Sequence, residues 1–224
     1  MVNNYYTKNL NAHRLLQVYE TKIPRIKQYL DREISFVKDS LTGNEKILEL
    51  GAGYGRIVKE LEDNCKSIVG IDISHENVLL GKAYLKDSNN AEIMVMDAHN
   101  LEFKEQFDVI LCLQNGLSAM NVKSQDFIKK ILNMVVDGGK VYLSTYSMKF
   151  WKYRLMWFEE QANKGLLGEI DLDKTKNGDI ICKDGFKATT HSIEDLKMIG
   201  YLSGYKYEIQ EVDESSVFLI IHKR

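Results

Sequence analysis

Three glycines follow a short apolar segment that contains one acid. The segment ILEL, residues 47–50, carries Glu49 and runs directly into Gly51, Gly53 and Gly55. A glycine adopts a positive φ at little cost and lets the backbone approach a ligand closely. The residues that follow, GRIVKELEDN, have helical spacing, so the free N–H groups of a helix N-terminus would face that ligand. The pattern predicts a strand, a ligand-binding turn and a helix.

The spacing of these glycines separates two families of cofactor-binding proteins. A dinucleotide-binding motif, G-x-G-x-x-G, would place its third small residue at position 56. This chain has Arg56 there and its third glycine one position earlier. The pattern E-x-G-x-G-x-G instead resembles motif I of the class I S-adenosylmethionine-dependent methyltransferases. The guanidinium of Arg56 would either reach the methionine carboxylate of that cofactor or lie in solvent, and of the two we expect solvent.

Four further segments follow in the order that this family shows. The apolar segment SIVGIDIS, residues 67–74, contains Asp72, and AEIMVMDAHNL, residues 91–101, contains Asp97 and Ala98. The segment FDVILCLQNGLS opens into a polar turn at Gln114, and VVDGGKVYLST supplies a fifth strand. A carboxylate at the position of Asp72 can accept hydrogen bonds from both hydroxyls of a ribose, with either cofactor. The acid and the neighbouring backbone amide at 97 and 98 are typical of adenine contacts in the methyltransferases.

The resemblance covers residues 45–147 well, and it implies a set of cofactor contacts. For S-adenosylmethionine, and for its product S-adenosylhomocysteine, these are Glu49, Gly51, Ala52, Gly53, Asp72, Ile73, Asp97, Ala98, Leu113 and Gln114. Many small-molecule members of the family close the site with an N-terminal lid, so the resemblance implies this role for Tyr6 together with Tyr5; the alternative is that both belong to a frayed terminus. No residue is assigned to a metal.

The elements that must position these residues alternate along the chain. Apolar residues recur at helical spacing before the glycines, at Leu15, Tyr19, Ile23, Ile26, Leu30, Ile34 and Val37. Because Pro24 is acceptable in the first turn of a helix, we expect two N-terminal helices that meet near residues 21–24. Helical segments at 55–65, 75–87 and 122–136 lie between the apolar segments, which requires right-handed crossovers.

This order predicts an α/β fold, a doubly wound, Rossmann-like, mostly parallel sheet with helices on both faces, and the resemblance implies a seven-stranded sheet with an antiparallel last strand. In such sheets, ligands bind beyond the carboxyl ends of the strands, where Gly51, Asp72, Asp97 and Gln114 would converge. We expect a single domain, residues 1–224, with N-terminal helices at 1–40, a cofactor-binding core at 45–147, a substrate-side insertion at 148–190 and a C-terminal helix and strands at 191–224.

The insertion combines an aromatic helix with a β-hairpin around Asp184 and Gly185. Its aromatic faces would either hold a cationic group by cation–π attraction or belong to the core. Substrate contacts are predicted for Asn115, Tyr146, Phe150, Trp151 and Trp157.

Methyl transfer is an in-line displacement that needs a nucleophile near the methyl carbon, so positioning supplies most of the rate. A nucleophile that arrives protonated also needs a general base, for which His191 and His99 are the candidates. The alternatives are that His99 caps the adenine and that His191 is a turn residue. The turn from Leu113 to Gly116 departs from the N-P-P-Y type of enzymes that methylate nucleobase amines. This favours a small-molecule acceptor, which the sequence does not identify.

Composition limits the remaining classes of function. The net charge of −2 gives no general attraction to nucleic acid, and the N-terminus lacks the order of a signal peptide, so a cytoplasmic protein is expected. Cys65, Cys112 and Cys182 form no C-x-x-C pair and suggest neither a disulfide framework nor a zinc site. We expect no membrane partner, and either a monomer or a homodimer.

Three hypotheses remain, in this order. They are a small-molecule methyltransferase, an NAD-dependent oxidoreductase that uses the same glycine turn, and a non-catalytic module that binds S-adenosylmethionine. An RNA methyltransferase is a weaker fourth, because it would require a basic surface patch.

Overall fold

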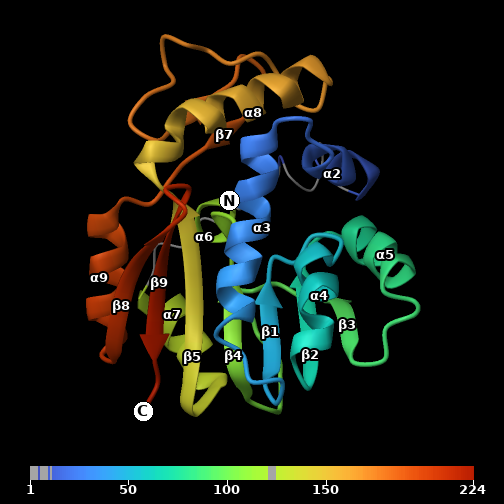
Figure 1. Cartoon of the computed structure of the whole chain (residues 1–224), viewed down its shortest axis with the longest axis vertical. Helices are drawn as coiled ribbons and strands as arrows, with labels where there is room; N and C mark the ends of the chain where they lie inside the picture. The colour runs from blue at the N-terminus through green and yellow to red at the C-terminus, as the bar shows by residue number, and fades with distance from the viewer. Residues whose placement is uncertain (1–4, 6–9, 11, 121–124) are drawn as a thin grey trace.

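A seven-stranded sheet forms the centre of the molecule (Figure 1). The computed structural model describes residue 5, residue 10, residues 12–120 and residues 125–224 of the chain. The strands lie in the order β3-β2-β1-β4-β5-β9-β8. Their bounds are β1 Lys46–Leu50, β2 Ser67–Asp72, β3 Ala91–Val95, β4 Phe107–Cys112, β5 Val135–Tyr146, β8 Lys206–Val212 and β9 Ser216–His222. All pairs from β3 to β5 are parallel, and β9 runs antiparallel to both of its neighbours, β5 and β8.

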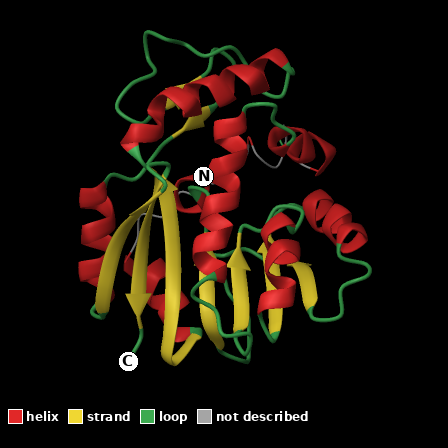
Figure 2. Ribbon diagram, viewed as in Figure 1, coloured by secondary structure: helices red, strands yellow, loops and turns green. Residues whose placement is uncertain are grey.

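Helices connect the strands and cover both faces of the sheet (Figure 2). The helices are α2 Ala12–Tyr19, α3 Pro24–Lys38, α4 Arg56–Leu61, α5 His75–Tyr84, α6 Gly116–Ala119, α7 Gln125–Asn133, α8 Trp151–Asn163 and α9 Ile193–Ser203. Two short 3-10 turns, Glu62–Asn64 and Met148–Phe150, extend α4 and precede α8. The strands β6 Ile180–Ile181 and β7 Lys187–Ala188 form a separate hairpin.

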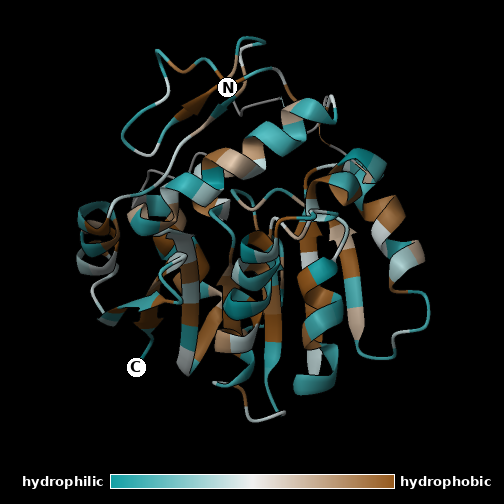
Figure 3. Cartoon of the chain, turned by 45° about the horizontal axis from the view of Figure 1, so that its top comes forward, coloured by the Kyte–Doolittle hydropathy of each residue, from teal (hydrophilic) through white to brown (hydrophobic). Residues whose placement is uncertain are grey.

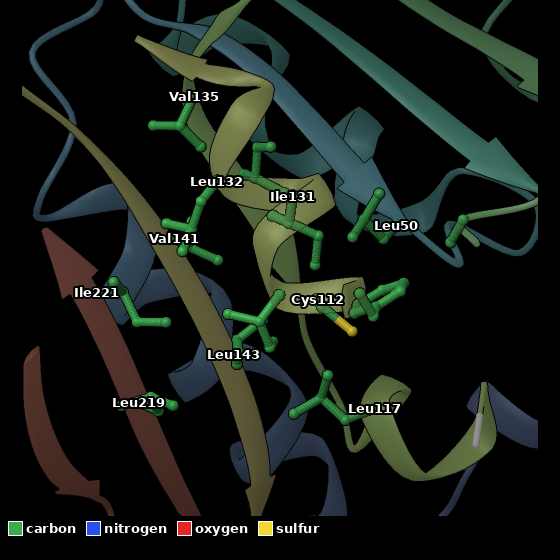
Figure 4. Close-up of a cluster of buried hydrophobic side chains, with 14 of the residues drawn as sticks. Leu50, Cys112, Leu117, Ile131, Leu132, Val135, Val141, Leu143, Leu219 and Ile221 are labelled. Atoms are coloured by element: carbon green, nitrogen blue, oxygen red, sulfur yellow. The ribbon is translucent and has the colours of Figure 1, made fainter. Parts of the chain in front are cut away.

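The strands are apolar on both faces because helices cover both. Successive residues of β1 and β4 alternate between two buried clusters, so Leu48 and Ile110 pack with α7 and α9, while Ile47 and Val109 pack with α3 and α4. Figure 4 shows side chains on the α7 side of the sheet, among them Ile131, which belongs to α7. Coloured by hydropathy, the strands are mostly apolar, and the helices carry polar residues as well (Figure 3).

A third buried cluster lies beyond the carboxyl ends of the parallel strands, where α2, α8 and the β6–β7 hairpin lie at the top of Figure 1. Trp157 of α8 donates from Nε1 to the carbonyl of Val18 in α2 at 3.1 Å. Arg14 of α2 donates to the carbonyls of Gly165 and Leu166, which follow α8. The N-terminal helix and the insertion are therefore joined over the end of the sheet.

The fold predicted from the sequence is confirmed, including the antiparallel last strand and the two N-terminal helices that separate before Pro24. The hairpin predicted around Asp184 and Gly185 is present as β6 and β7. The predicted helical segment 122–136 is longer than α7, because Val135 already pairs with Phe107 of β4. The three cysteines are buried and free. Within the described residues, no helix combines the length and the apolar character needed to cross a membrane.

Gly70 in β2 provides a test of how tightly the sheet packs on α4. A Cβ atom at this position would lie 2.7 Å from Cβ of Ala52 and 2.8 Å from Cγ2 of Val58, and both of these side chains are short and buried. We expect Gly70→Ala to lower the free energy of unfolding by about 1 to 3 kcal/mol, because the neighbours have no room to move. Urea denaturation measures this.

Ser67→Thr is the matched control, because it adds one methyl group to a partly exposed position in the same strand. Its free energy of unfolding should stay within about 0.5 kcal/mol of the parent value. An unchanged value for Gly70→Ala would show that β2 and α4 are not in close contact.

Candidate functional site

The glycine loop between β1 and α4 reverses the chain with three left-handed residues. Gly51, Gly53 and Gly55 have φ values of 71°, 58° and 84°. A residue with a side chain adopts such angles at a cost, which explains the glycines at these positions. The N–H of Ala52 donates to the carbonyl of Ile71 at 2.9 Å, so the loop is bonded to the end of β2.

Asp72, the last residue of β2, fixes the loop through its carboxylate. Oδ2 accepts a hydrogen bond from the N–H of Gly53 at 2.9 Å. Oδ1 accepts from the N–H of Ser74 at 2.8 Å and from Nδ2 of Asn77 at 3.2 Å. Burial raises the pKa of Asp72 above its usual value, although the three hydrogen bonds oppose the shift. Oδ1 of Asn77 also accepts a hydrogen bond from the N–H of Ala12 at 2.6 Å, so the start of α2 is connected to Asp72 through Asn77.

Asp97 and Ala98 follow β3 and line the same side of the site as Asp72. Oδ1 of Asp97 accepts from the N–H of His99 at 2.8 Å and lies 3.0 Å from Nδ1 of the imidazole. Although burial alone would raise the pKa of Asp97, the hydrogen bonds from His99 hold it below its usual value. The ring of His99 packs on Phe127, with centroids 5.3 Å apart. His99 therefore belongs with the pair of Asp97 and Ala98.

The turn after β4 is held in an unusual backbone conformation. Gln114 and Asn115 have φ values of 53° and 62°, which residues with side chains rarely adopt. The N–H of Gln114 donates to Oγ of Ser144 at 2.8 Å and to Oε2 of Glu33 at 3.1 Å. Nδ2 of Asn115 donates to the carbonyl of Thr189 at 2.7 Å, and its Oδ1 accepts from Thr145 at 2.9 Å. The amide of Asn115 thus joins the turn to the insertion.

Glu33 supports the turn at Gln114, a role that the sequence analysis missed. It lies on α3, is fully buried, and contacts the turn although it is distant from the turn in the sequence. Burial raises its pKa to about 7, although hydrogen bonds from neighbouring hydroxyls and from the N–H of Gln114 lower it in part. The available signal was an acid between Leu30 and Ile34, on the apolar stripe of a helix.

One cavity of about 240 Å³ brings these elements together. Its lining near the glycine loop and the ends of the strands includes Glu49, Gly51, Ala52, Gly53, Asp72, Ile73, Asp97, Ala98, His99, Leu113, Gln114 and Asn115. Its other wall includes Leu10, Leu15, Val18, Tyr19, Tyr146, Arg154, Trp157, Phe158, Gln161, Phe186 and Ala188. Residues that are distant in the sequence therefore line one cavity. All the residues predicted to contact the cofactor, apart from Tyr6, are among them.

Several buried polar atoms of the lining find no hydrogen-bond partner among the described residues. They are Oε2 of Glu49, Nε2 of Gln114, and both Nε and Nη2 of Arg56. Burial raises the pKa of Glu49 to about 8, and the nearby guanidinium of Arg56 lowers it only in part. Since buried polar groups are costly without partners, these atoms are suited to a polar ligand.

Some predicted residues lie elsewhere. Tyr6 is outside the described residues. Phe150, Trp151 and His191 do not line the cavity, and Phe150 is fully buried in the third cluster against Tyr29. Tyr5 bonds through its hydroxyl to Asp184 of the hairpin and packs on Phe186 at 4.8 Å between centroids, so this lid residue contacts the insertion.

The predicted aromatic surface is largely used by the chain's own cations. The guanidinium of Arg154 lies 4.6 Å from the ring centroid of Tyr146 and 5.5 Å from that of Phe158. It also donates to the carbonyl of Gly178 and to the hydroxyl of Thr190. Arg25 lies 5.0 Å from the centroid of Phe150. Cation–π pairing is therefore present within the protein itself, and the contact of these rings with a cationic ligand stays a prediction.

Arg56 also differs from its prediction, because it does not lie in solvent. It lines the cavity, and its guanidinium carbon lies 4.7 Å from the ring centroid of Tyr19. Helix α2 covers the glycine loop and supplies this ring, which the local sequence around Arg56 did not reveal.

The raised pKa of Glu33 predicts a pH dependence of stability. The unfolded chain releases this proton near pH 4.5, whereas the folded chain keeps it up to about 7. The free energy of unfolding should therefore fall as pH rises through this interval, by at most about 3 kcal/mol from this group. Glu33→Gln keeps an acceptor for Gln114, so it should lose less stability than the parent between pH 5 and pH 8.

Urea denaturation at several pH values measures this effect, with the exposed acid Glu92 changed to Gln as control. That control should follow the parent at every pH. Parallel curves for the parent and Glu33→Gln would contradict the assignment.

Comparisons with known proteins agree with this geometry. Residues 47–139 match the family model of a methyltransferase domain. A ubiquinone biosynthesis O-methyltransferase of Azoarcus sp. (strain BH72) is 25% identical over 112 residues, which are 49% of this chain and 47% of that protein. The chain spans about half the length of the curated relatives that it matches.

Solved structures match over nearly the whole chain. A magnesium protoporphyrin IX methyltransferase from Synechocystis PCC 6803 has a TM-score of 0.65 at 15% identity, covering 100% of this chain and 98% of that one. A protein from Pyrococcus horikoshii OT3 has a TM-score of 0.65 at 17% identity, covering 100% and 97%. At these identities the likeness establishes the fold. Residues 47–139 match a methyltransferase domain, and this match, the ordered motifs and the fold together support a class I S-adenosylmethionine-dependent methyltransferase.

Proposed function

We propose that this protein binds S-adenosylmethionine and transfers its methyl group to a small-molecule acceptor by in-line displacement. The observation that carries the proposal is the single cavity at the carboxyl ends of the strands. One wall holds the glycine loop and the acids that follow β2 and β3, and the other holds aromatic residues of α8 and the hairpin. A cofactor and an acceptor would therefore meet in one space.

The cofactor wall fits the groups that S-adenosylmethionine presents. The carboxylate of Asp72 accepts three hydrogen bonds, and a carboxylate has about four lone-pair positions, which leaves capacity for a ribose hydroxyl. Gly51 lines the cavity without a side chain, so the ligand can approach its backbone closely. The buried atoms of Glu49 and Gln114 that lack partners in the described structure supply an acceptor and a donor. We assign Ala52, Ile73, Asp97, Ala98 and Leu113 to the same ligand.

Residues 148–190 are assigned to the acceptor side. Trp157 in this segment and Tyr146 just before it line the cavity. Phe150 and Trp151 do not line it and pack in the third buried cluster. Asn115 lines the cavity, but both ends of its amide already bond to Thr189 and Thr145. We therefore assign it the role of holding the turn and the insertion together.

The cofactor supplies an electrophilic methyl group, and the residues of the chain supply position and exclude water. Helix α2 and the insertion close the cavity, and the turn at Gln114 faces it from β4. His99 lies beside Asp97 at the adenine end, and His191 does not line the cavity. We assign neither of them as the base that removes a proton from the acceptor. The cytoplasmic location and the acceptor class stay predictions from the sequence.

Calorimetric titration with S-adenosylhomocysteine, beside NAD, tests the cofactor. Micromolar binding of S-adenosylhomocysteine and no comparable binding of NAD are expected, because the cavity holds the methyltransferase pattern of glycines and acids. Selective binding of NAD would favour the oxidoreductase, and binding of neither ligand would contradict the proposal.

Asp72→Ala should weaken binding of S-adenosylhomocysteine by at least about tenfold, since hydrogen bonds to a charged acceptor are worth roughly 1.5 to 3 kcal/mol. The same titration measures the loss. Asp87→Asn, which changes an exposed acid after α5, serves as control and should bind as the parent does. Equal affinities for Asp72→Ala and the parent would remove Asp72 from the site.

Turnover separates an enzyme from a module that only binds. We expect S-adenosylhomocysteine to form from S-adenosylmethionine when a panel of small phenols, amines, thiols and acids is supplied, and mass spectrometry measures both products. Tight binding of the cofactor without turnover across the panel would favour the non-catalytic module.

A further inference from the structure

One face of helix α8 lines the cavity. Arg154, Trp157, Phe158 and Gln161 are the buried residues of this helix, and all four belong to the cavity wall. They are separated by three or four residues, which places them on the same side of a helix. A ligand on the acceptor side of the cavity would therefore meet these side chains.

Gln161 differs from Arg154 and Trp157 because its polar group is not used within the described part of the chain. It is 4% exposed, and among the described residues its side-chain amide has no hydrogen-bond partner. Trp157, in contrast, donates from Nε1 to the carbonyl of Val18. A buried amide without a partner is costly, so the amide of Gln161 is suited to a polar group of a ligand.

Two aromatic rings flank this amide. Gln161 follows Trp157 by four residues and Phe158 by three, so it lies one turn further along α8, at an angle between theirs. The bond from Trp157 to Val18 fixes one ring against α2. Phe158 packs on Phe186 of the hairpin, with centroids 6.0 Å apart. The amide is therefore held between two rings whose positions are set by other elements.

Arg154 stabilises the same wall from the other end of α8. It is 1% exposed and donates hydrogen bonds to the carbonyls of Gly178 and Ala188 and to the hydroxyl of Thr190. These bonds join α8 to the chain that forms the β6–β7 hairpin. A side chain on a wall that is already fixed loses less freedom when it binds a ligand. Gln161 is preorganised in this sense.

The composition of the wall indicates the class of ligand that it fits. Leu10, Val18 and Ala188 are buried, apolar and part of the lining, as are the two rings of α8. Aromatic rings pack favourably against other rings in offset or edge contacts. An amide donates and accepts hydrogen bonds but carries no charge, so it suits a neutral polar group. A flat, largely apolar molecule with one such group meets both conditions.

We propose that the amide of Gln161 binds a neutral hydroxyl or amide group of an aromatic acceptor and thereby selects the acceptors that carry such a group. This inference rests on the proposed function. The rings of Trp157 and Phe158 contact the apolar body of the acceptor. The amide supplies discrimination, because an acceptor without the polar group leaves a buried amide unpartnered. Gln161 thus sets the specificity for the acceptor.

The test compares 2-naphthol with 2-methylnaphthalene, in which a methyl group replaces the hydroxyl on the same ring system. Equilibrium dialysis of the full chain measures both affinities, with saturating S-adenosylhomocysteine so that the cofactor part of the cavity is occupied. Gln161→Met keeps an unbranched side chain of similar length without the amide. Gln210→Met is the matched control, because it makes the same change at an exposed position on β8. Thermal unfolding establishes that each variant is folded.

We expect the ratio of the two affinities to move toward 2-methylnaphthalene by at least about fivefold in Gln161→Met, because only the hydroxyl loses its partner. In Gln210→Met the ratio should equal that of the parent. In the ¹⁵N-labelled parent, saturation with 2-naphthol should shift the side-chain amide signals of Gln161, which tests the contact without any variant.

An unchanged ratio in Gln161→Met, an equal change in Gln210→Met, or unshifted amide signals of Gln161 would overturn the inference. Failure of both compounds to bind a parent that binds S-adenosylhomocysteine would also overturn it and would leave the proposed function intact. Failure of the parent to bind S-adenosylhomocysteine at all would contradict the proposed function itself.

Discussion

The carboxylate of Asp72 joins several parts of this molecule through its hydrogen bonds. It accepts hydrogen bonds from Gly53, Ser74 and Asn77, and Asn77 in turn accepts from the backbone of Ala12. A carboxylate that is largely withdrawn from water needs such donors, because its burial is otherwise costly. The loop after β1, the start of α5 and the start of α2 are therefore set by one acid at the end of β2. A cavity bounded by these elements depends on that arrangement.

The remaining walls of the cavity come from long-range contacts that close over the sheet. Trp157 bonds to the backbone of α2, and Asn115 joins the turn after β4 to the insertion through Thr189. Glu33 and Glu49 are both withdrawn from water, which is why the pKa values of both acids rise. Burying these two acids is costly, and for Glu33 the structure shows what the acid does there, because it accepts a hydrogen bond from the strained turn at Gln114.

The cofactor side could be predicted because its signals are local. A left-handed turn favours glycine, and an acid at the carboxyl end of a parallel strand lies at the edge of the sheet where ligands bind. The positions of Gly53 and Asp72 could therefore be predicted from their spacing in the sequence. The acceptor side could not be predicted in the same way. Arg154 forms hydrogen bonds with Gly178 and Thr190 only in the folded chain, and its guanidinium then packs against the ring of Tyr146. The placement of Arg56 under Tyr19, and the burial of Glu33, likewise depend on helices from a distant part of the chain.

The central claim is that the cavity at the carboxyl ends of the strands holds the cofactor. Two-dimensional NMR of the ¹⁵N-labelled protein, titrated with S-adenosylhomocysteine, tests it most directly. The account predicts saturable shifts that are largest for the amides of Gly51, Gly53 and Gln114, with little change in α9, none of whose residues line the cavity. An absence of saturable shifts, or shifts concentrated in α9, would contradict it.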